Sequence, residues 1–423
     1  MASFNLNLPV LQNWDCHNCG GCCKQHLIEI TDVERNRIVN QGWTALDGIV
    51  QGKSVVEKMG GWFRRPRWRL AHQADGGCVF LDDRGLCRIH AKFGEAAKPL
   101  ACRIYPFAFH PEGQTVAVSL RFSCPSVVKN LGRTMFQQQS EIRRLATSVV
   151  PQELEKGLAP QINPSERLGW QEFRWFVAAL GETLSDTAVP LVVRLRRALH
   201  WTELVGQAKF HKLQGHRLRE FLGLVQESAH ADIPELPELD QEPTPLGRLY
   251  FRLLVAQYSR KDTSADLTTG LLGRWKLLQA IWKFSRGKGN IPPLQEAFRS
   301  VPFAALEMPY GPINGEQDEI LTRYLRVKVQ ALHFCGAAYY DVPFVEGFQS
   351  LALVVPVTLW IARWLAAGSG RSGWTTEDII KALSIADHHH GYSPALGQSA
   401  ARRRVQMLAD SGDLPRLVSW YLR

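Results

Sequence analysis

Secretory leaders and long unbroken apolar runs are both missing from this 423-residue sequence. Residues 1–16 have neither the basic start nor the apolar stretch that a secretory signal peptide requires. We therefore expect a cytoplasmic protein, in which thiols stay reduced and available as ligands instead of pairing in structural disulfides.

The most apolar segment, residues 351–367, is interrupted by Pro356 and contains Arg363. A membrane span needs roughly 20 predominantly apolar residues, so such a window would have to reach back to Glu346. The segment therefore predicts a buried helix, and we expect no stable membrane insertion.

Cysteine is scarce beyond the first third of the chain, because only Cys335 follows Cys124. From about residue 130 onwards, apolar residues recur at spacings of three and four, which is typical of helices. We predict an α+β, mostly helical protein, with a cysteine-cluster domain at 1–130 and a helical domain at 131–423. A proline-rich, acidic stretch at 228–246 is predicted to be a loop or linker.

The first domain has short, mixed elements. Residues 26–30 and 113–122 are predicted to be strands, and residues 76–90 to be two short strands around an Asp-Asp-Arg-Gly turn. A helix is expected from Thr31, whose side chain would form a capping box with Glu34. Such a small, loop-rich α+β unit is expected to need metal for its folding.

The net charge of +10 is concentrated near the cysteines, because residues 1–150 hold 19 Lys/Arg against 12 Asp/Glu. A basic and aromatic strip, residues 62–72, can bind nucleic acid, an anionic cofactor or an acidic protein face. Alternatively, it is a solvated face whose charge offsets thiolates. We favour the second interpretation and expect no nucleic-acid partner.

Four cysteines fall within eight residues, in "CHNCGGCC". Cys16, Cys19 and Cys22 have the spacing of the first three ligands of a ferredoxin-type run, whose fourth cysteine precedes a proline. Cys124 precedes Pro125 and is a candidate fourth ligand. We therefore predict a [4Fe–4S] cluster at these residues.

The remaining early cysteines are numerous enough for a second four-thiolate site: Cys23, Cys78, Cys87 and Cys102. Adjacent Cys22 and Cys23 are expected to point apart and to serve different centres, although the partition of the eight thiols stays open. Zn²⁺ is the alternative metal, since closed tetrahedral zinc sites also use Cys-x2-Cys pairs, at times with a histidine as one ligand.

Several other residues are weaker candidates. Arg103 and Tyr105 are predicted to contact the cluster and tune it, or else to pack the domain. His388–His390 are expected to be solvated loop residues more often than a metal site, and Asp82 is expected to shape a turn. Cys335 is predicted to be a buried small apolar residue.

Two further segments, "CVFLDDRGLCRIH" and "KPLACRIYPF", together with "CHNCGGCC" resemble the CxxCxxCC cysteine-cluster family of YkgJ-type zinc- or iron-chelating proteins. The resemblance covers about residues 14–126 and implies metal binding by the seven cysteines that match the family pattern, of which the first four are Cys16, Cys19, Cys22 and Cys23. It includes Cys78 with Phe80 and Leu81, Cys87 with Ile89, and Cys102 with Arg103, Tyr105 and Pro106.

This family includes flagellin lysine-N-methylases of the FliB type, and "DEILTRYLRVKVQAL" resembles a helix in their C-terminal half. The resemblance implies methyl transfer from S-adenosylmethionine to a lysine of a flagellin-like protein substrate, with an iron–sulfur centre required. The first cysteine group is more regular here than in those methylases, which puts the flagellin substrate in doubt. Neither a glycine-rich Rossmann turn nor a radical-type Cys-x3-Cys-x2-Cys run is found.

Two functions are therefore expected as alternatives. One is an iron–sulfur protein-lysine N-methyltransferase, and the other is a non-catalytic zinc or iron–sulfur module that serves as a structural adaptor. Redox sensing through Cys22 and Cys23 is a weaker third hypothesis.

Overall fold

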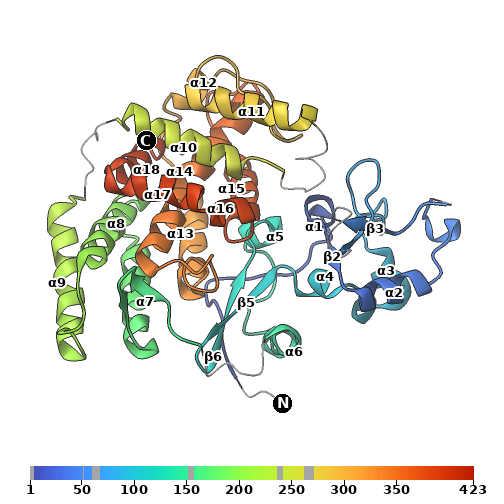
Figure 1. Ribbon diagram of the computed structural model, residues 1–423, viewed down its shortest axis with the longest axis horizontal. Coiled ribbons are helices and arrows are strands. Elements are labelled where there is room, and N and C mark those ends of the chain that lie inside the picture. Colours follow the sequence, from blue (N-terminus) through green and yellow to red (C-terminus); the bar gives the residue numbers. More distant parts are fainter. Residues whose placement is uncertain (1–3, 51, 60–66, 151–156, 236–241, 262–270) are drawn as a thin grey trace.

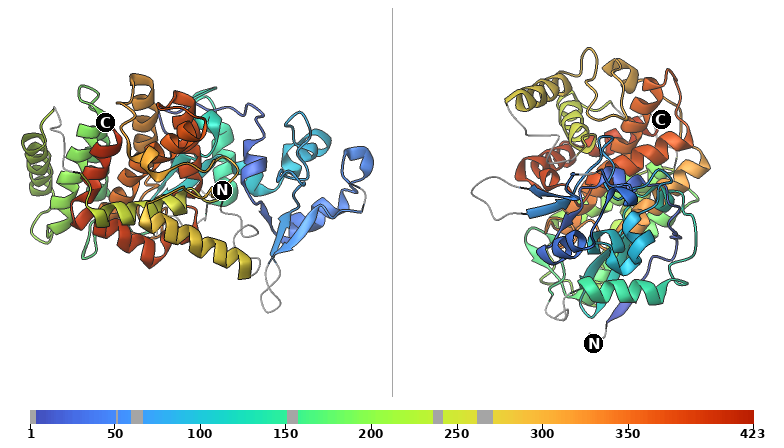
Figure 2. Two further views of the ribbon diagram at one scale, coloured as in Figure 1. Left: turned by 90° about the horizontal axis from the view of Figure 1, so that it is seen from above. Right: turned by 90° about the vertical axis from the view of Figure 1, so that its right-hand side faces the viewer.

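The computed structural model describes residues 4–50, 52–59, 67–150, 157–235, 242–261 and 271–423, with side chains from 275 in the last range. The chain forms a small lobe that projects from one end of a large helical body (Figures 1 and 2). This architecture confirms the predicted class, α+β and mostly helical.

The small lobe, called the cysteine lobe below, has its own hydrophobic core, in which Ile38, Phe80 and Ile89 are almost fully buried. Its antiparallel sheet has the strand order β2-β4-β3, with Glu29 opposite Arg69 and Val56 opposite Leu70. The elements of this lobe are α1 (Gly21–Gln25), β2 (Glu29–Ile30), α2 (Asp32–Asn40), β3 (Val56–Met59), β4 (Arg67–Leu70), α3 (Arg88–Phe93) and α4 (Leu100–Ile104), with short 3₁₀ turns at Ala45–Asp47 and Glu95–Ala97.

A second sheet joins the chain start to the helical body. It has the order β1-β6-β5, with β1 (Asn5–Asn7) parallel to β6 (Thr115–Leu120), and β5 (Phe107–Glu112) antiparallel to β6. Five of the six residues of β6 are buried, and Phe107 and Leu120 pack in the core of the helical body. From Phe107 onward most of the buried apolar residues pack in the larger core, because so apolar a strand needs it, while the domain boundary at 130 stays a prediction.

The helical body is built around α14 (Phe344–Gly368), which packs against α15, α8 and α18. The elements of the body that follow β6 in the chain are α5 (Pro125–Val128), α6 (Gln139–Val149), β7 (Gln161–Asn163), β8 (Glu166–Arg167), α7 (Trp170–Ser185), α8 (Leu191–Gln207), α9 (His216–Asp232), α10 (Pro245–Tyr258), α11 (Leu271–Arg286), α12 (Phe303–Glu307), α13 (Gly315–Gln330), α14, α15 (Thr376–His389), α16 (Pro394–Gly397), α17 (Ser399–Asp410) and α18 (Asp413–Tyr421).

Helix α14 is the one described helix that is long and apolar enough to cross a membrane, but 89% of its most apolar window is buried inside the protein. The Arg363 guanidinium, also fully buried, donates to the carbonyl oxygens of Leu306 (3.2 Å), Met308 (2.8 Å) and Tyr421 (3.1 Å). A charged residue is tolerated here because backbone acceptors satisfy it. The predicted buried helix is confirmed.

Two local predictions are confirmed. Thr31 caps α2 in a reciprocal capping box with Glu34, and β6 lies within the predicted strand 113–122. The two strands predicted in 76–90 are reduced to isolated antiparallel bridges, Leu81 with Cys87 and Cys78 with His72. The Asp82 carboxylate accepts from the N–H groups of Arg84 (3.0 Å) and Leu86 (2.7 Å), which favours a tight turn, and Arg88 begins a helix.

The predicted loop at 228–246 is shorter in the structure. Its first residues belong to α9, which continues to Asp232, and its last residues begin α10 at Pro245. Residues 236–241 lie outside the described part of the chain. Proline at the first position of α10 starts that helix instead of extending the loop, because the first N–H of a helix needs no partner within it.

Candidate metal centre

The CHNCGGCC segment forms a loop followed by a short helix. Gly20 has a φ of 66° and lies against Leu81, and helix α1 follows it directly. Cys16 and Cys19 therefore lie in the exposed loop, whereas Cys22 and Cys23 lie in α1 and are half-buried. The left-handed conformation at Gly20, which glycine adopts without strain, marks the point at which the first four cysteines separate into two pairs.

Five thiols gather inside the cysteine lobe, and we call them the inner thiol group. The Sγ atoms of Cys22 and Cys23 lie 4.0 Å apart, and the Cys78 N–H donates to the Cys23 carbonyl (2.8 Å). Cys87 immediately precedes α3, and Cys102 lies in α4. The inner thiol group thus draws on four separate segments of the chain and consists of Cys22, Cys23, Cys78, Cys87 and Cys102.

Burial and mutual repulsion both disfavour thiolates in this group. Burial raises the pKa of Cys78 to about 12, with smaller contributions from the charges of Cys87 and Cys22. Burial also raises the pKa of Cys102, and the neighbouring Cys78, Cys87 and Cys22 raise it further. The pKa of Cys22 is raised first by its hydrogen bond with Cys23 and then by burial. A bound cation would remove this penalty, because metal coordination deprotonates thiols.

The other three early cysteines, Cys16, Cys19 and Cys124, lie along the junction with the helical body and are called the outer thiol group. Cys19 Sγ lies beside Gly21, which also approaches Pro125, and His17 Nδ1 is 3.3 Å from Ser126 Oγ. Burial, above all, raises the pKa of Cys124, and the nearby Cys19 adds to that rise. These contacts bring the loop of Cys16 and Cys19 next to the segment of Cys124.

One sequence expectation needs correction. Cys22 and Cys23 do not point apart, because their Sγ atoms lie 4.0 Å apart within the first turn of α1. Cys22 is electrostatically close to Cys78 and Cys102, and its predicted grouping with Cys16 and Cys19 stays a prediction. Within the described ranges, no three His, Cys, Asp or Glu side chains are arranged to hold a metal ion. The thiols are neighbours, and which of them bind metal stays a prediction.

Tyr105 lies between the two thiol groups. Its pKa is raised by burial and then by the charges of Cys124 and Cys22, while its hydroxyl is 3.2 Å from Ser123 Oγ. Arg103 is half-buried in α4, and its Nε is buried with no partner in the described structure. Of the two residues predicted to contact the cluster, Tyr105 is thus electrostatically close to both thiol groups.

A buried polar network, which the sequence analysis missed, ties the cysteine segments to the helical body. Lys328 of α13 and Asp387 of α15 form a fully buried ion pair (2.7 Å), and Asp387 also accepts from the Ser123 N–H (3.0 Å). Lys328 Nζ lies 3.1 Å from His333 Nδ1, which is 3.2 Å from Ser119 Oγ. The available sequence signal for this network was the lysine inside the run Arg-Val-Lys-Val. This signal is weak, because helices often carry one charged residue among apolar ones.

The histidines at 388–390 are not a solvated loop. His388 and His389 end α15, and His389 and His390 are buried. His390 Nδ1 is 3.0 Å from the Tyr258 hydroxyl, and the His388 ring stacks on His26 from the cysteine lobe (centroids 4.7 Å apart). Packing against the cysteine lobe and α10 explains their burial. Cys335 is 1% exposed, as predicted for a small apolar core residue.

The basic strip is only partly described. Residues 62–66 lie outside the described ranges, whereas Arg67 pairs with Glu29 and Arg69 pairs with Glu57 (2.6 Å) across the sheet of the cysteine lobe. Trp68 is covered by the Arg35 guanidinium, 3.9 Å from the ring centroid. The described arginines of the strip are therefore engaged within the lobe.

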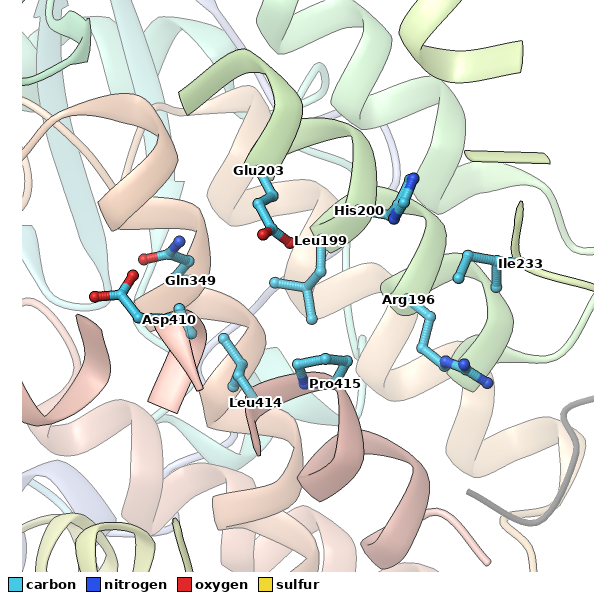
Figure 3. A pocket seen from close by; sticks show the side chains of 10 residues that line it. Arg196, Leu199, His200, Glu203, Ile233, Gln349, Asp410, Leu414 and Pro415 are labelled. Atoms are coloured by element: carbon cyan, nitrogen blue, oxygen red, sulfur yellow. The ribbon is translucent and has the colours of Figure 1, made fainter. Parts of the chain in front are cut away.

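A hollow of about 160 Å³ lies in the helical body, away from the cysteines (Figure 3). Glu203 and His200 of α8 face it together with Asp410 of α17. None of the residues that we predicted as ligands lines it, so it is separate from the thiol groups.

A small lobe rich in cysteines is the class of unit that binds thiophilic metals such as zinc or iron. Residues 15–125 match the protein-family model CxxCxxCC, described as "Putative zinc- or iron-chelating domain". This match supports metal binding by the N-terminal part of the chain, with zinc or iron as the metal. Searches of curated proteins and of solved structures found no match.

Proposed function

We propose that the chain is a metal protein in which Cys22, Cys78, Cys87 and Cys102 bind iron, in an iron–sulfur cluster, or zinc. The observation that carries this proposal is the convergence of separate segments on one small core, where Cys78 and Cys87 pack together and the Cys78 N–H binds the segment of Cys22 and Cys23. The charges of Cys22, Cys78 and Cys87 also raise the pKa of Cys102. Thiolate coordination is common to both metals. When bound, the metal would neutralise the thiolates and join four segments of the lobe.

The number and grouping of the thiols bear on which metal is bound. The outer thiol group offers three further ligands, so a second centre would fit beside the first. A cluster held by only three cysteines would leave one coordination position on its metal open. If Cys22 binds metal together with the inner thiol group, the ferredoxin-type run no longer favours iron. A closed set of four cysteines from separate segments is equally suited to structural zinc.

The experiment is elemental analysis of the full chain purified without oxygen. Iron with acid-labile sulfide and brown colour would identify an iron–sulfur protein, and a colourless protein with stoichiometric zinc would identify a zinc protein. Cys102→Ser should lose the metal of the inner thiol group. Cys335 is a buried cysteine far from both groups, so Cys335→Ser should keep the wild-type metal content. Wild-type protein without either metal, or an unchanged metal content in Cys102→Ser, would overturn the proposal.

Protein-lysine methyl transfer is the second candidate function. The observation that favours it is the position of α13, whose sequence resembles a helix of FliB-type methylases and which contributes Tyr324 and Lys328 to the buried network beside Cys124. A substrate lysine must lose its proton before it attacks a methyl group, and a desolvated site favours the neutral amine. S-adenosylmethionine would be the donor, and a protein with exposed lysines, such as flagellin, the substrate.

This candidate is tested by incubating the metal-loaded protein with methyl-labelled S-adenosylmethionine and purified flagellin. Label on lysine that depends on the chain and falls in Cys102→Ser would support methyl transfer. Metal-loaded protein that transfers no label, to flagellin or to a lysine-rich mixture of cell proteins, would favour the non-catalytic adaptor.

A further inference from the structure

Five side chains meet where the cysteine lobe contacts the helical body, and we call them the Arg121 cluster. The Arg121 guanidinium carbon lies 3.7 Å from the ring centroid of Tyr392 and 5.8 Å from that of Tyr105. His26 lies 4.9 Å from Tyr105 and 4.7 Å from His388, measured between ring centroids. The cluster consists of His26, Tyr105, Arg121, His388 and Tyr392.

Three polar atoms of this cluster are buried without a partner in the described structure: Arg121 Nε, His26 Nε2 and the Tyr392 hydroxyl. His26 is only 9% exposed. The one hydrogen bond described for the Arg121 side chain is a long one, from Nη2 to the His388 carbonyl (3.4 Å). Buried polar atoms of native proteins rarely stay unpaired, so a convergent set of them indicates a ligand.

The charges of the neighbourhood leave one positive charge uncompensated. Lys328 and Asp387 neutralise each other in their buried pair. Arg121, by contrast, forms no ion pair with any described carboxylate. Two buried histidines near Lys328, His333 and His390, stay neutral because burial lowers their pKa. A group with one negative charge would complement the site, and a guanidinium binds a planar carboxylate through two parallel hydrogen bonds.

We propose that the Arg121 cluster is a binding site for a small molecule with a single carboxylate group. Arg121 pairs with the carboxylate, the Tyr392 hydroxyl and His26 Nε2 complete its hydrogen bonds, and the faces of Tyr105 and His388 cover the apolar part of the ligand. Because His26 follows Cys23 by three residues and Arg121 precedes Cys124 by three, the ligand would lie between the two thiol groups. This inference does not depend on methyl transfer.

Ligand-detected NMR with benzoate, on the full chain, tests the proposal. Benzamide has the same shape without the charge, and inorganic phosphate tests for a general anion site. We expect saturation transfer to benzoate and none to benzamide. Equimolar phosphate should not displace benzoate. Loss of a charge-assisted hydrogen-bond pair corresponds to roughly a tenfold weaker affinity or more, which is the change expected for Arg121→Gln.

Two variants separate binding from folding. Tyr392→Phe removes one hydroxyl and should weaken benzoate binding by roughly threefold to tenfold without loss of structure. Arg219→Gln is the matched control and should bind as wild type, because Arg219 also covers an aromatic ring (4.2 Å from the centroid of Trp175) but is at an exposed position of α9. Equal binding of benzoate and benzamide, full displacement by phosphate, or unchanged affinity in both Tyr392→Phe and Arg121→Gln would overturn the proposal.

Discussion

The carboxylate of Asp387 accepts a hydrogen bond from the Ser123 N–H at 3.0 Å, although the two residues are 264 positions apart in the sequence. Asp387 is also paired with Lys328 at 2.7 Å, and neither side chain is exposed. Since Ser123 immediately precedes Cys124, this contact fixes the segment of the outer thiol group against α13 and α15. The helical body therefore takes part in placing a cysteine of the N-terminal domain.

Replacing Asp387 by Asn should destabilise the protein by about 3–5 kcal/mol, because Lys328 would be left buried with an uncompensated charge. The free energy of unfolding, measured with urea, checks this value. Glu377→Gln is the matched control, since Glu377 lies on the same helix in a partly exposed pair with Lys129 (2.5 Å). That change should cost about 1 kcal/mol or less. Equal losses in the two variants would contradict a special role for the buried pair.

We expect that metal can be removed from the inner and the outer thiol group separately. If each group holds one centre, Cys78→Ser should lower the metal content by the share of the inner group and leave the outer one intact. Cys124→Ser should do the reverse, because Cys124 is electrostatically coupled to Cys19 of the outer thiol group. Metal per protein and the visible spectrum of each variant give the answer. Complete metal loss in both variants would indicate one shared centre.

The metal-free protein should lose stability as the pH rises from about 9 to 12. Burial raises the pKa of Cys78 from its ordinary value of 9.0 to about 12, so the folded state keeps a proton that the unfolded state releases. The unfolded state then binds fewer protons, and stability falls with rising pH in this window, whereas below pH 9 the thiol contributes no slope. Urea unfolding at several pH values measures the slope, which Cys78→Ser should reduce. An identical slope in that variant would contradict the assignment.

Arg363→Met should destabilise the protein by about 3 kcal/mol or more, since it leaves three buried carbonyl groups without their donor. These carbonyls belong to Leu306, Met308 and Tyr421, so the variant should also loosen the C-terminal helix, which hydrogen exchange can detect. Arg403→Met, at an exposed position of α17, should change the free energy of unfolding by about 0.5 kcal/mol or less. A stabilised Arg363→Met would show that packing outweighs the hydrogen bonds.

Local signals in the sequence predicted local structure well. The capping box at Thr31 and Glu34 and the buried character of α14 depend on neighbours within a few residues or on composition. The difference at 76–90 has a similarly local cause, because an aspartate that binds two backbone N–H groups favours a turn over a strand. The match of residues 15–125 to a chelating domain agrees with the metal chemistry that the cysteine pattern predicted.

Long-range relations could not be predicted in this way. Cysteine spacing did not predict that Cys22 is electrostatically close to Cys78 and Cys102, which lie far from it in the sequence. The Arg121 cluster joins residues from four distant segments, and its members look ordinary in the sequence.

The sequence by itself determined that thiols are concentrated in the first 124 residues and that helices follow, because residue type and periodicity set ligand chemistry and local conformation. Only the tertiary structure decided which thiols become neighbours and that Asp387 reaches Ser123. Those contacts depend on how whole elements pack, and packing joins residues whose separation along the chain carries no signal.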